Sequence, residues 1–167
     1  FILSRMDAGL SYPEALAEAN RSGYTEADPT LDVDGIDAAQ KLSILGRLAF
    51  GDHLPWQEIP RQGIRDLSRQ AVQEARSRGK VLRLVARAAR ADGKTMASVE
   101  LLELPPEDAL ARVQGEHNGV RLKLAGAETL FFSGPGAGAL PTASALLADA
   151  VRIAKRIAAR DAETVPA

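Results

Sequence analysis

An aspartate and a lysine four residues apart, Asp37 and Lys41, are the side chains of this sequence best suited to proton-transfer chemistry. Residues at positions i and i+4 lie on the same side of an α-helix, so the carboxylate and the ammonium can meet. An ammonium held there can orient a carbonyl oxygen and transfer a proton to it. The spacing alone, however, favours the simpler interpretation of an ion pair that only supports its helix.

Acidic residues crowd the segment that precedes this pair, and they strengthen the catalytic interpretation. Their side chains belong to Glu26, Asp28, Asp32 and Asp34. Carboxylates so close together can attract a substrate that carries an ammonium group. Their spacing does not match the EF-hand loop of about twelve residues, so we do not expect a calcium site.

A glycine-rich stretch between an expected strand and an expected helix is a second candidate site. Gly134, Gly136 and Gly138, followed by Ala139, fit the G-x-G-x-x-G/A pattern of dinucleotide-binding turns. Only one helix is expected after it, so the second strand and the acidic ribose contact of a Rossmann unit are missing. A tight strand-to-helix turn also explains the glycines. In a third interpretation, backbone amides there approach part of a nucleotide whose main site lies elsewhere.

Composition and charge indicate an ordinary folded domain. Hydrophobic residues make up 46% and charged residues 26% of the 167 residues, which allows one domain with a substantial core. The net charge of −1 gives no general attraction to nucleic acid or to anionic membranes, and the 4% of aromatic residues offer no stacking platform. No apolar stretch approaches the roughly 20 residues of a membrane-spanning helix.

The numbers of cysteine and histidine residues limit the kinds of catalytic and metal sites that the chain can form. The sequence has no cysteine and two histidines, and neither His53 nor His117 has an acid or a nucleophile at a suggestive spacing. We therefore expect no disulfide, no thiolate nucleophile and no metal site. The absence of cysteine is compatible with a cytoplasmic protein.

Hydrophobic periodicity and turn signals predict helices first, then hairpin-like strands, then a final helix. The expected helices are 1–10, 12–22, 36–50, 66–78, 107–113 and 141–159, and the expected strands are 80–90, 95–104, 119–124 and 128–133. Asp92-Gly93 marks a hairpin turn, and Ser11 is the expected N-cap of the second helix. This order predicts an α+β fold with a mixed, largely antiparallel sheet that has helices on one face. We expect one domain over 1–160 and a tail or linker over 161–167.

The helix expected over 36–50 has two distinct sides. On a helical projection the candidate pair shares its side with three large apolar residues, Ile44, Leu45 and Leu48. The side expected to face water carries Gln40, Ser43 and Arg47. A charged pair on an apolar side must be satisfied locally or point into a polar pocket at the edge of the core. Asp34 is the expected cap of this helix.

The first residues suggest that this chain is part of a larger molecule, and the last helix carries an apolar face that we expect to be exposed. Its residues are Leu146, Leu147, Ala150, Ile153, Ala154 and Ile157. The sequence begins at Phe1, without Met and without the layout of a signal peptide, which predicts a fragment that starts within a helix.

Three stretches of the sequence resemble the homoserine dehydrogenase family. The first contains Phe-Ile-Leu-Ser-Arg-Met over 1–6, and the third contains the glycine-rich stretch and Pro-Thr-Ala-Ser-Ala over 141–145. The second is the most specific and runs from Gly-Tyr-Thr-Glu-Ala-Asp-Pro over 23–29 to Asp-Gly-Ile-Asp-Ala-Ala-Gln-Lys over 34–41. Together they cover nearly the whole chain in the family's order.

This resemblance implies NAD(P)-dependent interconversion of L-homoserine and L-aspartate 4-semialdehyde, a step in threonine and methionine biosynthesis. It implies that Lys41 is the catalytic acid and base, and that Asp37 is its partner and a contact to the substrate. Glu26 would bind homoserine, and Asp32 would lie near the substrate's ammonium group.

The resemblance also implies a cofactor and a partner. Gly134, Gly136 and Gly138 would touch NADP or NAD, whose main site in the family lies in a nucleotide-binding domain that precedes the position of Phe1. A homodimer formed through this domain is implied as well. Without the nucleotide-binding domain we expect little or no turnover from the chain alone. The alternative is a non-catalytic dimerisation or sensor module that reuses this fold.

Overall fold

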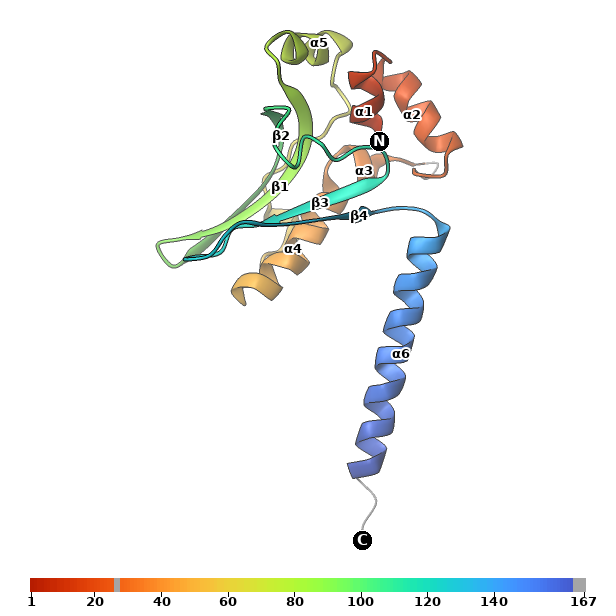
Figure 1. Ribbon diagram of the computed structural model, residues 1–167, viewed down its shortest axis with the longest axis vertical. Helices are drawn as coiled ribbons and strands as arrows, with labels where there is room; N and C mark the ends of the chain where they lie inside the picture. The colour runs from red at the N-terminus through yellow and green to blue at the C-terminus, as the bar shows by residue number, and fades with distance from the viewer. Residues whose placement is uncertain (26–27, 164–167) are drawn as a thin grey trace.

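The computed structural model describes residues 1–25 and 28–163. Its helices are α1 (Ile2–Asp7), α2 (Tyr12–Arg21), α3 (Thr30–Val33), α4 (Ile36–Phe50), the short 3₁₀ helix η1 (Trp56–Glu58), α5 (Arg69–Ser77) and α6 (Ala139–Glu163). Its strands are β1 (Val81–Ala91), β2 (Lys94–Leu104), β3 (His117–Leu122) and β4 (Leu130–Pro135). The order of elements confirms the predicted α+β class (Figure 1).

The strands form two antiparallel hairpins, β1–β2 and β3–β4, rather than one continuous sheet of the described residues. In the first, the pairing runs from Val81 opposite Leu104 to Ala91 opposite Lys94. Its turn is the predicted Asp-Gly, with φ of 51° at Asp92 and 77° at Gly93, as a tight hairpin turn requires. An isolated parallel bridge joins Arg61 to Val99 of β2, so the pairing is mixed but largely antiparallel.

Helices cover one face of the β1–β2 hairpin. Alternate residues of β1, Leu82, Leu84, Ala86 and Ala88, point to the same face. Leu82 and Leu84 pack in a core built from α1, α2 and α5, and Leu84, Ala86 and Ala88 pack in a second core beneath α4. Leu84 therefore joins the two cores, and the prediction of helices on one face is confirmed.

Helix α4 lies on the sheet with its small residues, which corrects the predicted orientation of this helix. Ala39, Leu42 and Gly46 are its buried positions. A Cβ atom on Gly46 would lie 2.4 Å from a methyl group of Leu54, so a larger residue here would displace the Leu54 side chain. The large residues Ile44 and Leu48, expected at the edge of the core, are instead 62% and 79% exposed. The projection assigned the side with the largest apolar residues to the core. In the structure, α4 instead buries the side that carries Ala39, Leu42 and Gly46.

An extended segment over 60–64 ties helix α4 to strand β2. Val99 donates its N–H to the carbonyl of Pro60 at 2.9 Å and accepts the N–H of Gln62 at 2.8 Å. On its other side the segment donates the N–H of Ile64 to the carbonyl of Val33 at 2.7 Å. A Cβ atom on Gly63 would lie 2.6 Å from that same carbonyl oxygen, so glycine is required for the approach.

The N-terminal helices begin as the sequence predicts, and several other boundaries differ. Helix α2 has the expected Ser11 cap, and Glu14 completes a capping box. Residues 30–33, expected in a loop, form α3, whereas 107–113, expected as a helix, form turns in which Asp108 accepts the N–H of Leu110. Helix α5 starts later than expected, at Arg69, after the Ser68 cap. Near these boundaries a short polar side chain, such as Ser68 or Asp108, hydrogen-bonds to the backbone where no helix or strand hydrogen bond is made.

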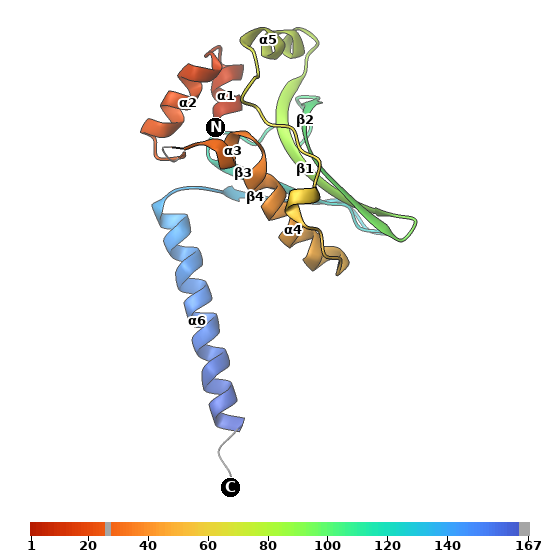
Figure 2. The same cartoon turned by 180° about the vertical axis from the view of Figure 1, so that it is seen from behind.

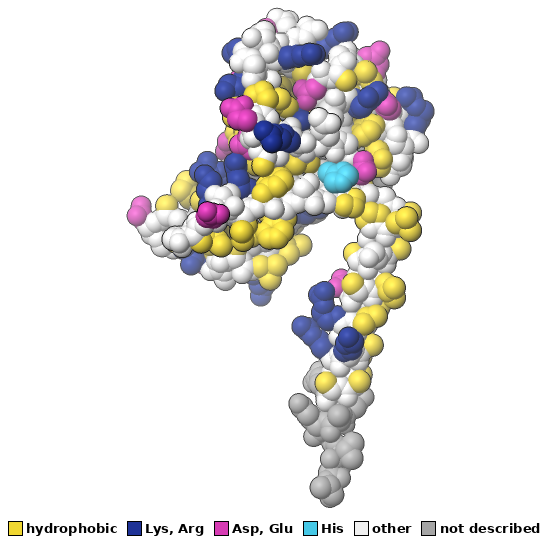
Figure 3. Space-filling model, in the orientation of Figure 1, with side chains coloured by type: hydrophobic (Ala, Val, Ile, Leu, Met, Phe, Trp, Pro, Cys, Tyr) yellow, Lys and Arg dark blue, Asp and Glu magenta, His cyan; other side chains and the backbone are white. Residues whose placement is uncertain are grey.

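Helix α6 extends away from the rest of the described chain in both views (Figures 1 and 2). The side chains of its predicted apolar face are exposed, at 68% for Leu146 and 57% for Ile153, which confirms that this face finds no cover within the described residues. Apolar side chains gather along α6 and over the β3–β4 hairpin (Figure 3). Among the described residues, no helix combines the length and hydrophobicity that crossing a membrane requires.

Replacing Gly63 with alanine should destabilise the fold. The new methyl group would contact the backbone of Val33 and Asp34, which cannot move without disturbing the start of α4. We expect a loss of about 1–3 kcal/mol in the free energy of unfolding, measured by urea denaturation. The control is Gly134→Ala, because a Cβ atom there would meet nothing within 4 Å. Equal stability of the two variants would contradict the close approach.

Asp52 should make part of the stability depend on pH. Its carboxylate accepts hydrogen bonds from the Thr95 hydroxyl at 2.5 Å and from Arg90 at 2.7 Å, which joins the end of α4 to the tip of the β1–β2 hairpin. These bonds, that of Thr95 first, lower the pKa of Asp52 below its usual 3.8. The stabilisation is therefore fully present above 3.8 and is lost as the pH falls through the lower folded-state pKa.

The test compares thermal unfolding of the natural protein and Asp52→Asn across this acidic range. Because the Arg90 and Asp52 side chains are 42% and 38% exposed, we expect the variant to be only slightly less stable near neutral pH and the difference to shrink as the pH falls. Thr95→Val should reproduce part of the effect, because it removes the first of the two donors. A difference that does not change with pH would show that the Asp52 carboxylate is not linked to folding in this way.

Candidate functional site

The predicted Asp37–Lys41 pair forms at the start of helix α4. The Nζ atom of Lys41 donates to Oδ2 of Asp37 at 2.5 Å, as the spacing of four residues predicts. The two side chains are 54% and 41% exposed, so the pair lies at the surface rather than on the side of α4 that faces the core. The ammonium and the carboxylate are thus held together and remain accessible to a small molecule.

Gly35, and not Asp34, precedes the first turn of α4, so the predicted capping role of Asp34 is wrong. Gly35 adopts a left-handed conformation with φ of 73°, and a Cβ atom on it would lie 2.9 Å from the carbonyl oxygen of Gln62. The Asp34 carboxylate is engaged by Arg65, at 2.9 Å from Nε and 3.0 Å from Nη2. Hydrogen bonds from this guanidinium lower the pKa of Asp34 below its usual value.

The acidic segment is folded rather than irregular where the structure describes it. Asp28 accepts both the N–H and the hydroxyl of Thr30, at 3.0 and 2.5 Å, and these bonds lower the pKa of Asp28. Thr30 starts helix α3, which carries Asp32 as an exposed residue and packs against α4. Glu26 lies outside the described residues. Helix packing therefore places Asp32 on an element in contact with the one that carries Asp37 and Lys41.

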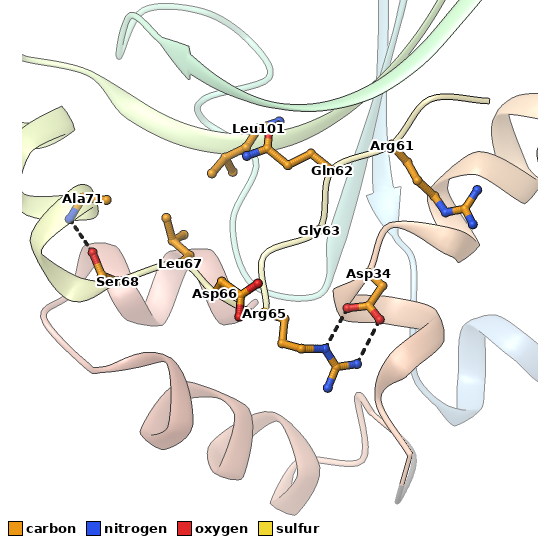
Figure 4. A pocket seen from close by; sticks show the side chains of 10 residues that line it. All are labelled: Asp34, Arg61, Gln62, Gly63, Arg65, Asp66, Leu67, Ser68, Ala71 and Leu101. Carbon is orange, nitrogen blue, oxygen red and sulfur yellow. Dashed lines mark hydrogen bonds and ion pairs between the residues drawn. The ribbon is translucent and has the colours of Figure 1, made fainter. Parts of the chain in front are cut away.

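A surface pocket of about 590 Å³ lies next to this segment but is lined by other residues (Figure 4). Asp34 and Arg65 form part of its wall, together with Arg61, Asp66 and Ser68. The predicted site residues that the structure describes, Asp32, Asp37 and Lys41, do not line it. The pocket thus belongs to the contact between Asp34 and the 60–66 segment, and the candidate catalytic pair lies on open surface instead.

The glycine-rich stretch has a structural role that accounts for part of its pattern. A Cβ atom on Gly136 would overlap the Asn118 side chain, at 2.3 Å from Nδ2, so a larger residue just after β4 would displace this side chain of β3. Gly138 has φ of 113° at the entry to α6, where its carbonyl accepts the Thr142 hydroxyl. Around Gly134 a Cβ atom would meet nothing within 4 Å. Packing against Asn118 and the entry to α6 thus account for Gly136 and Gly138, whereas no contact accounts for Gly134.

Arg65 and Gly63 are the residues of this region that reasoning from the sequence missed. Arg65 lies 31 positions beyond Asp34, and nothing in its neighbours along the chain marks a partner for that carboxylate. Gly63 lies in a segment without regular periodicity. No group of three or more potential metal-binding side chains occurs among residues 1–25 and 28–163.

The arrangement can perform one kind of chemistry directly. An exposed ammonium held by a carboxylate can orient an oxygen atom of a small molecule and exchange a proton with it. The acidic residue of the neighbouring helix α3 can attract a positive group on the same molecule. The site therefore suits a small substrate that combines an ammonium group with a hydroxyl or carbonyl oxygen.

Comparison with known proteins is consistent with this chemistry. The family model for homoserine dehydrogenase matches residues 1–151. The homoserine dehydrogenase of Lactococcus lactis is 40% identical over 157 residues, covering 93% of this chain and 37% of that protein. The homoserine dehydrogenase of Bacillus subtilis is 37% identical over 159 residues, covering 94% of this chain and 36% of that protein. The chain thus spans less than two-fifths of the length of these relatives.

Solved structures agree with the fold. A homoserine dehydrogenase from Thiobacillus denitrificans superimposes with a TM-score of 0.88 and 38% identity, covering 99% of this chain and 39% of that one. A Staphylococcus aureus homoserine dehydrogenase at pH 6.0 gives 0.86 and 34%, covering 100% and 41%. Because the family model matches most of the chain and the structures agree along its length, this chain belongs to the homoserine dehydrogenase family.

Proposed function

We propose that this chain supplies the substrate-binding and proton-transfer residues of an enzyme that interconverts L-homoserine and L-aspartate 4-semialdehyde. The observation that carries the proposal is the accessible Asp37–Lys41 ion pair beside the acidic helix α3. Family membership identifies the chemical class as that of an oxidoreductase. The alternative, a plain surface ion pair of a non-catalytic module, predicts no effect of Lys41 on turnover, and the Lys41→Ala assay below separates the two.

Lys41 is the proposed acid and base of the reaction. In the direction of oxidation, its amine accepts the proton of the substrate hydroxyl, and in the reverse direction its ammonium returns a proton to the developing alkoxide. Asp37, at 2.5 Å from the lysine nitrogen, holds Nζ in place and contacts the substrate. Both groups project from the first turns of α4, whose packed small face gives them a fixed frame.

Carboxylates of the acidic segment are the proposed site for the substrate's ammonium group. Asp32, on α3, would lie near that group, and Glu26 would bind homoserine beside it. Opposite charges at such a distance orient the substrate as well as attract it. The hydroxyl end of the substrate is then directed toward Lys41.

NAD or NADP is the proposed cofactor, and when bound it accepts the hydride released from the carbon that bears the substrate hydroxyl. Among this chain's residues, the backbone at Gly134 and Gly138 fits a contact to the edge of such a cofactor, and Gly136 is used in packing. We propose that the main cofactor site lies in a part of the enzyme outside this chain. The chain by itself would then show little or no turnover.

Exposed apolar surface supports contacts with further protein. On α6 it includes Leu146 and Ile153, which we assign to contact with a nucleotide-binding domain. On the β3–β4 hairpin, Phe132 is 58% exposed, and we propose that this surface contributes to a homodimer. Large exposed apolar residues gathered in this way are typical of protein interfaces.

Replacing Lys41 with alanine in the full-length enzyme should nearly abolish oxidation of L-homoserine. Because general acid–base catalysis contributes a factor of about 10²–10⁴, we expect a fall in kcat of this size. The assay follows reduced nicotinamide by absorbance, with NAD and NADP in turn. The control is Lys94→Ala, at the exposed start of β2 beside the hairpin turn, which should keep full activity. Full activity of the Lys41 variant would remove Lys41 from the mechanism.

Asp32→Asn should weaken substrate binding more than it slows the reaction. Losing the charge that faces the substrate ammonium should raise KM for L-homoserine about tenfold, with a smaller effect on kcat. Asp92→Asn is a matched control, because it makes the same change in the β1–β2 turn, where asparagine tolerates the positive φ. An unchanged KM in the Asp32 variant would show that another group binds the ammonium.

A further inference from the structure

We propose that Arg65 is a positioning residue that fixes the acidic segment around helix α3 in the geometry needed to bind substrate. The proposal rests on the proposed function, because it concerns the same substrate site. Arg65 is not a catalytic residue in this proposal. It acts through Asp34 and Thr30, at the two ends of the helix that carries Asp32.

The guanidinium of Arg65 contacts both ends of α3 at once. Its Nε and Nη2 atoms donate to the two carboxylate oxygens of Asp34, at 2.9 and 3.0 Å, just after the helix (Figure 4). Nη2 also donates to the hydroxyl oxygen of Thr30 at 3.1 Å, at the start of the helix. A planar guanidinium can make these contacts together because its donors have fixed directions.

The contact to Thr30 extends toward the preceding part of the acidic segment. The same hydroxyl donates to Asp28 at 2.5 Å, and Asp28 also accepts the N–H of Thr30. A continuous series of hydrogen bonds thus runs from Arg65 through Thr30 to Asp28. The backbone that carries Asp32 is held at both ends, at Thr30 and at Asp34.

Arg65 lies in a backbone segment that is held by hydrogen bonds on both sides. The preceding Ile64 is 6% exposed in the core and donates its N–H to Val33, within α3. Two residues earlier, Gln62 donates its N–H to Val99 of β2. The backbone that carries Arg65 therefore connects the acidic segment to the sheet, and the Asp32 carboxylate on α3 is held in a fixed position.

This network contributes to geometry rather than to the stability of the fold. The side chains of Arg65 and Asp34 are 46% and 36% exposed, and ion pairs so open to water add little to the free energy of unfolding. Loss of Arg65 should therefore leave a folded protein whose residues 28–34 are less ordered. The expected defect lies in substrate binding, whereas Asp37 and Lys41 stay fixed on α4.

The experiment measures steady-state kinetics of full-length Arg65→Ala with L-homoserine and the preferred nicotinamide cofactor. We expect KM for L-homoserine to rise about three- to tenfold while kcat changes less than about twofold. Arg65→Lys, which keeps the charge but not the fork of donors, should give an intermediate KM. Adding Asp34→Ala to Arg65→Ala should cause little further change, because the two residues act through one contact.

Arg78→Ala is the matched control, because Arg78 also contacts both carboxylate oxygens of one residue, Glu103, at an exposed position. This variant should leave KM unchanged. An unchanged or lower KM in Arg65→Ala, or an equal rise in Arg78→Ala, would overturn the positioning role. So would a fall in kcat at constant KM that follows a lower unfolding temperature, since that pattern indicates loss of folded enzyme.

Hydrogen exchange separates this inference from the proposed function. Backbone amides over 30–34 should exchange faster in Arg65→Ala than in the natural protein or in Arg78→Ala. If the natural full-length protein did not oxidise L-homoserine, the proposed function would fall, while faster exchange would still support Arg65 as the residue that orders this segment. Unchanged exchange in an active enzyme would overturn the positioning role alone.

Discussion

The close approach of two backbone segments, 33–35 and 62–64, is the constraint on which the rest of the structure depends. It requires glycine at positions 35 and 63, where a Cβ atom would lie 2.9 and 2.6 Å from a carbonyl oxygen. One segment leads directly into α4, and the other is hydrogen-bonded to β2. The approach thus fixes the helix to the sheet and sets the direction in which Asp37 and Lys41 project.

The carboxylates of the acidic segment are stabilised by hydrogen bonds from Arg65, outside it, and from Thr30, within it. Carboxylates placed close together repel one another, and the segment would not keep a defined shape without compensation. Hydrogen bonds from Arg65 and Thr30 engage Asp34 and Asp28, and they lower the pKa of both. The proposed site is therefore acidic enough to attract an ammonium group while its helix α3 keeps a defined position.

Many large apolar residues of the described chain lie at the surface, although others fill its core. Ala39 and Leu42 of α4 are buried with residues of the sheet, while Leu48 of the same helix is 79% exposed. On α6 the apolar face is exposed along the helix. Such surfaces are costly in water unless another protein surface covers them. They are compatible with an enzyme whose reaction centre forms where this chain meets further protein.

The sequence by itself determined most of the elements and the local pairs, although it missed α3 and wrongly predicted a helix over 107–113. It predicted the bounds of α4, the Ser11 cap and the Asp92-Gly93 turn, because these depend on neighbours within a few residues. The Asp37–Lys41 pair followed from helical spacing for the same reason. The tertiary structure alone decided that Asp34 binds Arg65, that α4 packs through its small residues, and that Gly136 packs against Asn118. Each joins residues far apart in the chain, so local periodicity carries no signal for it.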